Sequence, residues 1–258
     1  MTNSFSFTRL WMLIKKQWFD NAKLYLLTTL ALLGLMILVF IIFYIGSRPV
    51  YDEEATYVIF FVGLYLTGFV FASGIFSALG DRPKGIYWMS VPATHLEKLV
   101  CAIIYATVIF TVIYCVCFYS VQRVSFALFE TNPKFRVIYL KEWDFPMKIA
   151  AYAFFPLQAL YLLGSVYFER FSFIKTTLAG LIIILLFAFY AGHLTKWIMP
   201  ENASFFSVTS VRLYNEGQPD KIYQLSPFIS DSIDFLFKYL WLPVLWTASY
   251  FRLKEKEI

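Results

Sequence analysis

The uninterrupted stretch LYLLTTLALLGLMILVFIIFYIG, residues 24–46, decides the fold class. It carries no charged side chain, and it exceeds the roughly 20 apolar residues that a helix needs to cross the hydrocarbon core of a bilayer. A cleaved signal peptide would have a shorter apolar core followed by a small-residue cleavage site, and no such site follows here. We therefore predict a retained membrane-spanning helix.

Further apolar runs of similar length follow along the chain. Of its 258 residues, 60% are hydrophobic and only 15% are charged, whereas about a quarter of the residues of a soluble domain are charged. The runs are continuously apolar rather than alternating, which favours helices over a membrane barrel. We predict an all-α membrane protein that forms a single transmembrane domain over residues 1–258. Its six spans are expected at residues 24–46, 57–79, 99–121, 147–168, 173–194 and 233–251.

Some of these spans contain polar side chains or prolines. The fourth holds Pro156 and Gln158 and the sixth holds Pro243, features that are tolerated when a helix packs inside a bundle. Asp234 and Lys238, at the outer end of the sixth span, share a helix face and can pair. The thiols are expected to act as small buried hydrophobes, without a disulfide or a metal site; they are Cys101, Cys115 and Cys117 in the third span.

Lysine and arginine in the flanking segments predict the orientation, because cytoplasmic loops carry an excess of both. With the N-terminus inside, the inner segments are richer in Lys and Arg, while the outer loops carry most of the acids. Both termini and residues 80–98 are then cytoplasmic, and residues 122–146 and 195–232 are extracytoplasmic loops. Within the second loop, Asn215-Glu216-Gly217 is a turn signal between β-branched and aromatic residues, which predicts a short hairpin.

Residues 1–23 precede the first span and have a helical pattern of large apolar side chains. The rings and aliphatic groups recur at three- and four-residue spacing, at Phe7, Trp11, Ile14 and Trp18. This pattern predicts an amphipathic helix in the interface, with aromatic rings in the headgroup zone and basic residues near anionic lipid. The alternative is that the segment extends the first span. Because Lys15, Lys16 and Asp20 would be costly in hydrocarbon, we favour the interfacial helix.

The cytoplasmic segment GDRPKGIYWMSVPATHLEK, residues 80–98, separates the second and third spans. Proline and glycine predict a turn over residues 81–85, and Thr94 with Glu97 fits a capping box that begins the third span. Between them lies a compact amphipathic element whose Tyr87, Trp88 and Met89 are available for contact. The alternative is an ordinary tight connection whose aromatic rings lie in the membrane surface.

This arrangement resembles the membrane subunits of type-2 ATP-binding-cassette (ABC) transporters. The resemblance covers the topology of the whole chain and a short loop motif, matched here by Lys84, Gly85, Tyr87, Trp88, Val91, Pro92, Ala93, Thr94, Glu97 and Lys98. The outer loops are longer than a minimal permease needs. In that family the loop is similar to a coupling helix that docks on an ATPase subunit. The resemblance implies that the docking residues are Arg82, Lys84, Gly85, Tyr87, Trp88, Met89, Pro92 and Glu97.

The resemblance further implies the partners and the compartment. The chain has no phosphate-binding G-x-x-x-x-G-K-[ST], so ATP and Mg would be bound by a separate ABC ATPase subunit, and this chain would bind no cofactor. We also find no H-E-x-x-H motif and expect no enzyme activity, no metal site and no nucleic-acid partner. The expected location is the inner (cytoplasmic) membrane, in contact with membrane lipids and with a second permease copy or paralogue.

Small residues in the second span predict close helix packing. Small side chains four residues apart let helix backbones approach each other, and the pairs are Gly68/Ala72, Ser73/Ser77 and Gly74/Ala78. They could form a dimer interface, although packing within one bundle is favoured for most of them. Polar residues in the spans are few, which suits export of a lipid-like or amphipathic substrate. It equally suits a non-conducting scaffold or anchoring subunit.

Overall fold

The spans of the chain are helical, as the apolar runs predict. The computed structural model describes residues 5–46, 50–131, 136–138, 145–168, 170–198, 203–207, 210–213, 221–224 and 226–256. Within these residues, five helices are long and apolar enough to cross a membrane: Phe7–Ile42, Glu53–Gly74, His95–Thr131, Pro146–Tyr167 and Ser172–Ala191. The prediction of an all-α, multi-pass membrane protein is therefore confirmed.

The elements follow one another in a simple order. The helices of the first five spans are α1 (Phe7–Gly46), α2 (Glu53–Gly74), α4 (His95–Ile103) with the π-helical segment η2 (Ile104–Ile109) and α5 (Phe110–Thr131), α6 (Phe145–Tyr167) and α7 (Ser172–Ile198). Between α2 and α4 lie a 3-10 turn, η1 (Ser77–Gly80), and the short helix α3 (Arg82–Ser90). After α7, the last helical run consists of α8 (Pro227–Phe235), the π-helical η3 (Leu236–Leu240) and α9 (Trp241–Glu255).

Short strands join some of the helices. β1 (Val50–Asp52) pairs in parallel with β2 (Arg136–Ile138). β3 (Ala203–Ser207), β4 (Ser210–Leu213) and β5 (Lys221–Gln224) form an antiparallel sheet. The hairpin prediction is confirmed by the pairing of β4 with β5, and its turn, Asn215-Glu216-Gly217, lies outside the described residues.

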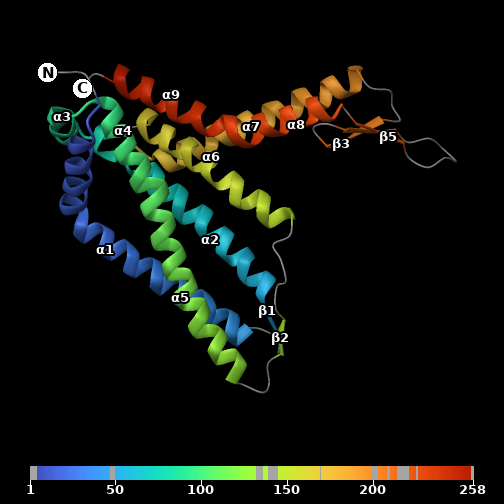
Figure 1. Cartoon of the computed structure of the whole chain (residues 1–258), viewed down its shortest axis with the longest axis horizontal. Coiled ribbons are helices and arrows are strands. Elements are labelled where there is room, and N and C mark those ends of the chain that lie inside the picture. The colour runs from blue at the N-terminus through green and yellow to red at the C-terminus, as the bar shows by residue number, and fades with distance from the viewer. Residues whose placement is uncertain are drawn as a thin grey trace.

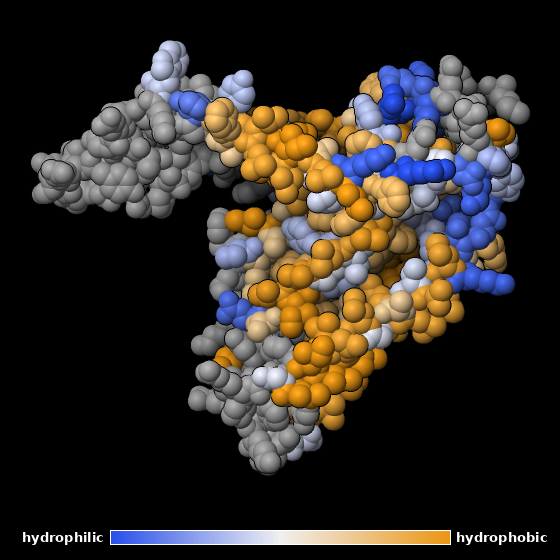
Figure 2. Space-filling view, turned by 180° about the vertical axis from the view of Figure 1, so that it is seen from behind, coloured by the Kyte–Doolittle hydropathy of each residue, from blue (hydrophilic) through white to orange (hydrophobic). Residues whose placement is uncertain are grey.

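Both ends of the chain lie at the same end of the helices. Figure 1 shows the N and C labels beside α3 and the start of α4, while β1 and β2 lie at the far end of α2 and α5. Lys256 Nζ donates a 3.3 Å hydrogen bond to the carbonyl of Val166, near the end of α6. We call this end, which contains residues 5–20, 75–98, 166–168, 170–175 and 252–256, the polar end. Figure 2 shows hydrophilic side chains gathered there and apolar side chains over most of the rest of the coloured surface in view.

Three predicted boundaries differ from the structure. α1 is one helix that joins residues 7–23 to the first span, and it changes direction in its early part (Figure 1). α2 ends at Gly74 rather than residue 79, because Phe76 and Leu79 are buried in a turn instead of a span. α5 continues to Thr131, so the segment expected to be a loop from residue 122 begins as helix. Phe129 lies in this extra part of the helix and is buried, so packing of its side chain stabilises the continuation.

The sixth predicted span is helical and contains a π-helical segment, as the third span does. α8, η3 and α9 follow one another from Pro227 to Glu255, and α9 alone has 15 residues. This run is not among the five helices that meet the length and composition of a span. The side chains of Asp234 and Lys238 lie outside the described part of the structure, so their predicted pairing stays a prediction.

α6 lies at the centre of the packing and contacts α2, α7 and α9. One apolar cluster joins α1, α2, α5 and α6 through Phe40, Phe60, Tyr114, Phe118 and Phe154. A second cluster, nearer the polar end, joins η1, α4, α6 and α9 through Leu79, Leu99, Leu162, Val166 and Leu253. Gln158 is buried in α6 and donates a 2.7 Å hydrogen bond to the carbonyl of Ala106 in η2, as expected for a polar residue inside a bundle.

The small residues of α2 divide into two groups. Gly68, Ala72 and Ser73 are buried within the bundle, and a Cβ on Gly68 would lie 2.9 Å from the Phe154 ring and 3.1 Å from the Phe110 ring. Gly74 and Ser77 are exposed, Ala78 is half-buried, and nothing lies within 4 Å of a Cβ built on Gly74. Because α2 ends at Gly74, the pairs that begin at Ser73 and Gly74 do not share one continuous helix.

α7 is the least covered of the spans. Every residue from 181 to 190 is exposed, around the full circumference of the helix. These residues are almost all apolar, so this part of α7 presents a surface that suits lipid or another membrane-embedded chain. Two of the three cysteines are buried apolar side chains, as predicted: Cys101 and Cys117 are buried, and Cys115 is half-buried.

Candidate functional site at the polar end

The short helix α3 is the most distinctive element of the polar end. Pro83 stands in its first turn, where the fixed backbone angle of proline favours a helix and its missing N–H leaves no bond unmade. Gly85 N donates a 2.7 Å hydrogen bond to the carbonyl of Asp81, and Lys84 Nζ lies 3.4 Å from the Asp81 carboxylate. The turn predicted over residues 81–85 is therefore the first turn of a helix. The helix ends at Ser90, and the residue before Pro92 is extended, as is usual before a proline.

The capping box that begins α4 is confirmed. The backbone N–H of Glu97 donates to Thr94 Oγ1 at 3.2 Å, and the backbone N–H of Thr94 donates to Glu97 Oε2 at 2.9 Å. Each side chain therefore satisfies a backbone donor that the first turn of a helix leaves without an intrahelical partner. This reciprocal pair fixes where the helix begins.

The second oxygen of the same carboxylate binds the start of α1. Glu97 Oε1 accepts hydrogen bonds from the Ser6 backbone N–H at 2.7 Å and from Arg9 Nε and Nη2 at 3.2 and 2.9 Å. The Glu97 side chain is fully buried, whereas that of Arg9 is 30% exposed. One buried carboxylate therefore joins the first turns of α1 and α4. The resemblance implies Glu97 as a docking residue, and in this arrangement its side chain is buried rather than exposed to a partner.

Two lysines cover the aromatic pair of α3. Lys16 Nζ of α1 lies 4.4 Å from the centre of the Tyr87 ring, and Lys98 Nζ of α4 lies 4.9 Å from the centre of the Trp88 ring. Trp88 also meets Phe76 edge to face, with ring centres 5.6 Å apart, and is half-buried. Cation–π contacts of this kind contribute about 0.5 to 2 kcal/mol each. They attach α3 to both α1 and α4.

The two faces of α3 therefore differ. Gly85 is buried, and Trp88 is half-buried against Phe76 and Lys98, so this side of α3 faces the protein. The outward face consists of Pro83, Ile86, Tyr87 and Ser90, at spacings of three, four and seven residues, and we call it the α3 outer face. Ile86 is 58% exposed and Tyr87 is 61% exposed. Lys84 and Pro92 are exposed beside this face, whereas the side chains of Arg82 and Met89 lie outside the described ones.

Ile86 is a member of this face that the sequence analysis did not single out. The helical period of residues 83, 86, 87 and 90 carries the signal. The predicted turn over residues 81–85 leaves the start of this helix undefined, so the sequence pattern alone does not show that Ile86 lies beside Tyr87 on one face.

The residues predicted to form an interfacial helix lie on two different sides of α1. Phe7, Trp11 and Trp18 are exposed, with Phe7 at 79%. Ile14 is half-buried beside the buried Leu10, and this side packs against α4 and η2, where the Tyr105 hydroxyl donates a 2.7 Å hydrogen bond to the Ile14 carbonyl. The early part of α1 therefore presents aromatic rings outward and attaches to the bundle through its aliphatic side chains.

The helices and their polar end define a multi-pass helical membrane protein. Among the described residues, no group of three or more His, Cys, Asp or Glu side chains could hold a metal ion. No protein-family model, no curated protein and no solved structure matches the chain.

Proposed function

We propose that the chain is the permease subunit of an ABC-type exporter that moves a lipid-like or amphipathic substrate. ATP would be hydrolysed on a separate ABC ATPase subunit, and this chain would itself be no enzyme. The observation that carries the proposal is the α3 outer face: a short helix at the polar end exposes Ile86 and Tyr87 side by side. Apolar and aromatic side chains of this kind are common anchors at protein interfaces.

The contacts that α3 makes with other helices support a role in transmitting movement. α3 is attached to α1 through the Lys16–Tyr87 contact and to α4 through the Lys98–Trp88 contact, and α1 and α4 are joined by the Glu97 carboxylate. A partner that moved α3 would therefore act on the early parts of two spanning helices, because these contacts couple α3 to both. A loosely attached loop would absorb such a displacement instead.

The proposed topology has six spans, with the run from Pro227 to Glu255 as the sixth. Both termini and α3 then lie in the cytoplasm, and residues 7–23 lie in the inner interface with their exposed rings among lipid headgroups. Basic residues at the polar end support this orientation, since Lys and Arg accumulate on the cytoplasmic side; they include Arg9, Lys15, Lys16, Lys84, Lys98 and Lys254.

A permease of this size would work as a dimer with a second copy or a paralogue. One bundle of this size has few polar side chains with which to line a passage. α7 supports the idea, because residues 181–190 are exposed on all sides and leave room for another chain. Cysteine pairs placed along this part of α7 should form crosslinks between copies, and their failure at every position would remove α7 from the interface.

A non-conducting scaffold or anchoring subunit is the second candidate. It is favoured by the buried polar side chains of the spans, such as Gln158 and Ser165, which pack between helices. A scaffold would need no ATPase and no docking helix, so the two candidates differ in their expected partner.

Co-purification with the ATPase tests the proposed function. We expect the double change Ile86→Glu and Tyr87→Ala to leave the protein inserted and folded, yet to weaken binding of the ATPase by about 30-fold, from about 2 kcal/mol of lost anchor contact. Leu96→Glu is the matched control, because Leu96 is 43% exposed at the same end but lies outside α3. Retention of the ATPase by the double variant, or equal loss in the control, would refute docking through α3.

The orientation has its own test in a background without native cysteines. Lys84 is exposed beside the α3 outer face, and Lys254 is exposed near the end of α9. Lys84→Cys and Lys254→Cys should both resist a membrane-impermeant thiol reagent in intact cells and react after the cells are opened. Labelling of either from outside would overturn the proposed topology.

A further inference from the structure

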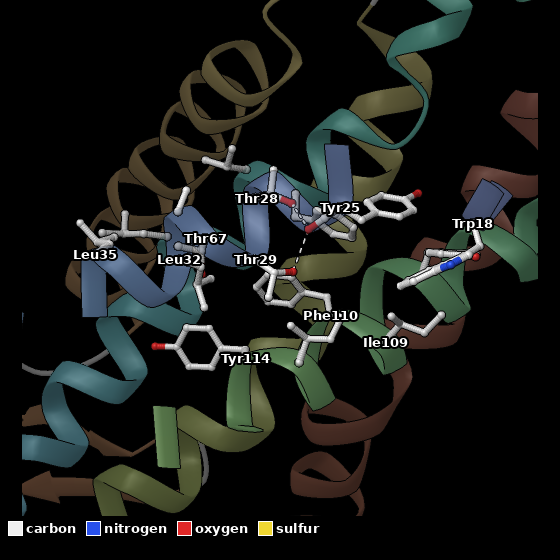
Figure 3. Close-up of a pocket in the computed structure, with 16 residues that line it drawn as sticks. Trp18, Tyr25, Thr28, Thr29, Leu32, Leu35, Thr67, Ile109, Phe110 and Tyr114 are labelled. Carbon is white, nitrogen blue, oxygen red and sulfur yellow. Dashed lines mark hydrogen bonds between the residues drawn. The ribbon is translucent and has the colours of Figure 1, made fainter. Parts of the chain in front are cut away.

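A hollow lies between α1, α2 and η2–α5, and no described residue of α3 lines it. Its volume is about 540 Å³. Figure 3 shows Trp18 at one end and Leu35 at the other, with Thr28, Thr29 and Leu32 of α1 along the length between them. We call this hollow the α1 groove. The sequence offered no sign of it, because it forms where three separate helices meet.

The α1 groove presents an apolar surface although several of its side chains carry hydroxyl groups. The threonine hydroxyls donate to carbonyls of their own helices: Thr28 to Leu24 and Tyr25, Thr29 to Tyr25, and Thr67 to Gly63. The Tyr105 and Tyr114 hydroxyls donate to the carbonyls of Ile14 and Phe60. A hydroxyl that is bonded in this way offers little to a polar ligand, so the groove suits hydrocarbon.

The groove opens sideways, toward the surface that would face lipid. Leu35, Leu66 and Val70 line it and are each more than half exposed. From Tyr25 to Leu35 the helix rises about 15 Å, which equals the hydrocarbon depth of one leaflet, half of about 30 Å. A lipid chain could therefore enter from the side and lie along α1 over its normal depth in the membrane.

The Trp18 end of the groove lies beside a basic stretch of α1. Gln17 Nε2 donates a 3.1 Å hydrogen bond to the Tyr25 hydroxyl, and the Trp18 and Tyr25 rings lie 5.9 Å apart. Around them, residues 15–23 contain three lysines and one aspartate, Asp20. Lys15 and Lys23 are exposed, and Lys16 faces the Tyr87 ring. The net charge of this stretch is positive, which complements an anionic headgroup.

We propose that the α1 groove is a binding site for an anionic phospholipid. One acyl chain lies between α1, α2 and α5, and the phosphate lies at the level of Trp18, next to the basic stretch of residues 15–23. The inference goes beyond the proposed function and does not depend on it, because the groove is built by this chain alone. The lipid is held whether or not an ATPase binds at α3.

The test uses the full chain, purified and reconstituted in nanodiscs without an ATPase. The probe is phosphatidylglycerol with a photoactivatable diazirine in one acyl chain, and crosslinked peptides are identified by mass spectrometry. We expect crosslinks to concentrate in residues 25–35, 66–71 and 105–114. Labelling of α7 residues 181–190 to the same extent would mean that lipid contacts the surface without a site, and would overturn the proposal.

A bulky side chain in the groove gives a matched comparison. Ala31 lines the groove and is exposed, whereas Leu27 is 66% exposed on the same helix and does not line it. Ala31→Trp should lower groove labelling at least fivefold, and Leu27→Trp should leave it unchanged. If Ala31→Trp does not fold, Val70→Trp takes its place, with Val62→Trp as its exposed control on α2. Equal labelling in a groove variant and its control would refute the site.

The headgroup is tested separately from the acyl chain. Phosphatidylcholine with the same diazirine chain should label the groove several-fold less than phosphatidylglycerol. Lys15→Gln with Lys23→Gln should remove that difference, while labelling by phosphatidylcholine stays as it was. Equal labelling by the two lipids in the unchanged protein would refute recognition of an anionic headgroup.

Discussion

Replacing Glu97 tests how the polar end is held together. The carboxylate accepts hydrogen bonds from two backbone N–H groups, those of Ser6 and Thr94, and from the Arg9 guanidinium. Glu97→Ala removes the acceptor from all of these donors and also removes half of the capping box. Glu97→Gln keeps an oxygen that can accept but loses the charge. The two variants therefore separate the contribution of the acceptor from that of the ion pair.

The expected cost follows from the burial of the two partners. Removing one partner of a buried ion pair costs about 3 to 5 kcal/mol, and loss of a helix cap costs about 1 kcal/mol. The Arg9 side chain is 30% exposed, so water can solvate it after the change, and the total for Glu97→Ala is reduced to about 3 kcal/mol. Glu97→Gln should cost about 1 to 1.5 kcal/mol, the part due to charge in the hydrogen bonds.

Thermal unfolding in detergent measures the difference. At about 2 to 4 °C per kcal/mol for a chain of this size, Glu97→Ala should lower Tm by about 6 to 12 °C and Glu97→Gln by about 2 to 6 °C. Hydrogen exchange should also accelerate at residues 6–10. Glu255→Ala is the control, because Glu255 is 67% exposed and pairs with Arg252 at 3.6 Å, a surface contact that contributes less than about 1 kcal/mol. A Tm for Glu97→Ala within 1 °C of this control, by the same scale, would refute the reasoning.

Two further predictions concern packing within the spans. Gly68→Ala should lower stability by about 1 to 2 kcal/mol, because its Cβ would press on the Phe154 and Phe110 rings. Gly74→Ala is the control, since nothing lies within 4 Å of a Cβ at that position. Equal Tm values for the two variants would contradict the close approach of α2 to α6. Gln158→Leu should change stability by less than about 1 kcal/mol, since it removes one hydrogen bond but also a buried Oε1 that has no partner. A Tm loss above about 5 °C for Gln158→Leu would show that the amide does more than bind the Ala106 carbonyl.

Local patterns in the sequence predicted the features that depend on near neighbours. The apolar runs identify the spanning helices, because a chain that is apolar over some 20 residues can satisfy its backbone in a membrane only as a helix. The capping box of Thr94 and Glu97 and the hairpin formed by β4 and β5 were likewise predicted, since each is decided by residues a few positions apart. Burial of Gln158 in a packed helix also followed from its place in an apolar run.

The boundaries of the helices were predicted less well, for a physical reason. Residues 75–79 are mostly apolar, yet they form a turn whose Phe76 and Leu79 are buried in the core. Hydropathy does not distinguish a span from a buried turn, because both remove apolar surface from water. At the other extreme, α5 continues through the polar residues Gln122 and Arg123, since a helix does not have to end where the hydrocarbon does.

Only the tertiary structure decided what the polar end presents to a partner and what it keeps inside. Glu97 and Arg9 are far apart in sequence, so nothing local showed that the capping carboxylate also binds the start of α1. The inward position of Trp88 and the outward position of Ile86 depend on the direction in which α3 packs against Phe76, Lys98 and Lys16. The α1 groove exists because α1, α2 and α5 meet without filling the space between them. Such a gap depends on how the three helices pack together, so the sequence of any one of them does not predict it.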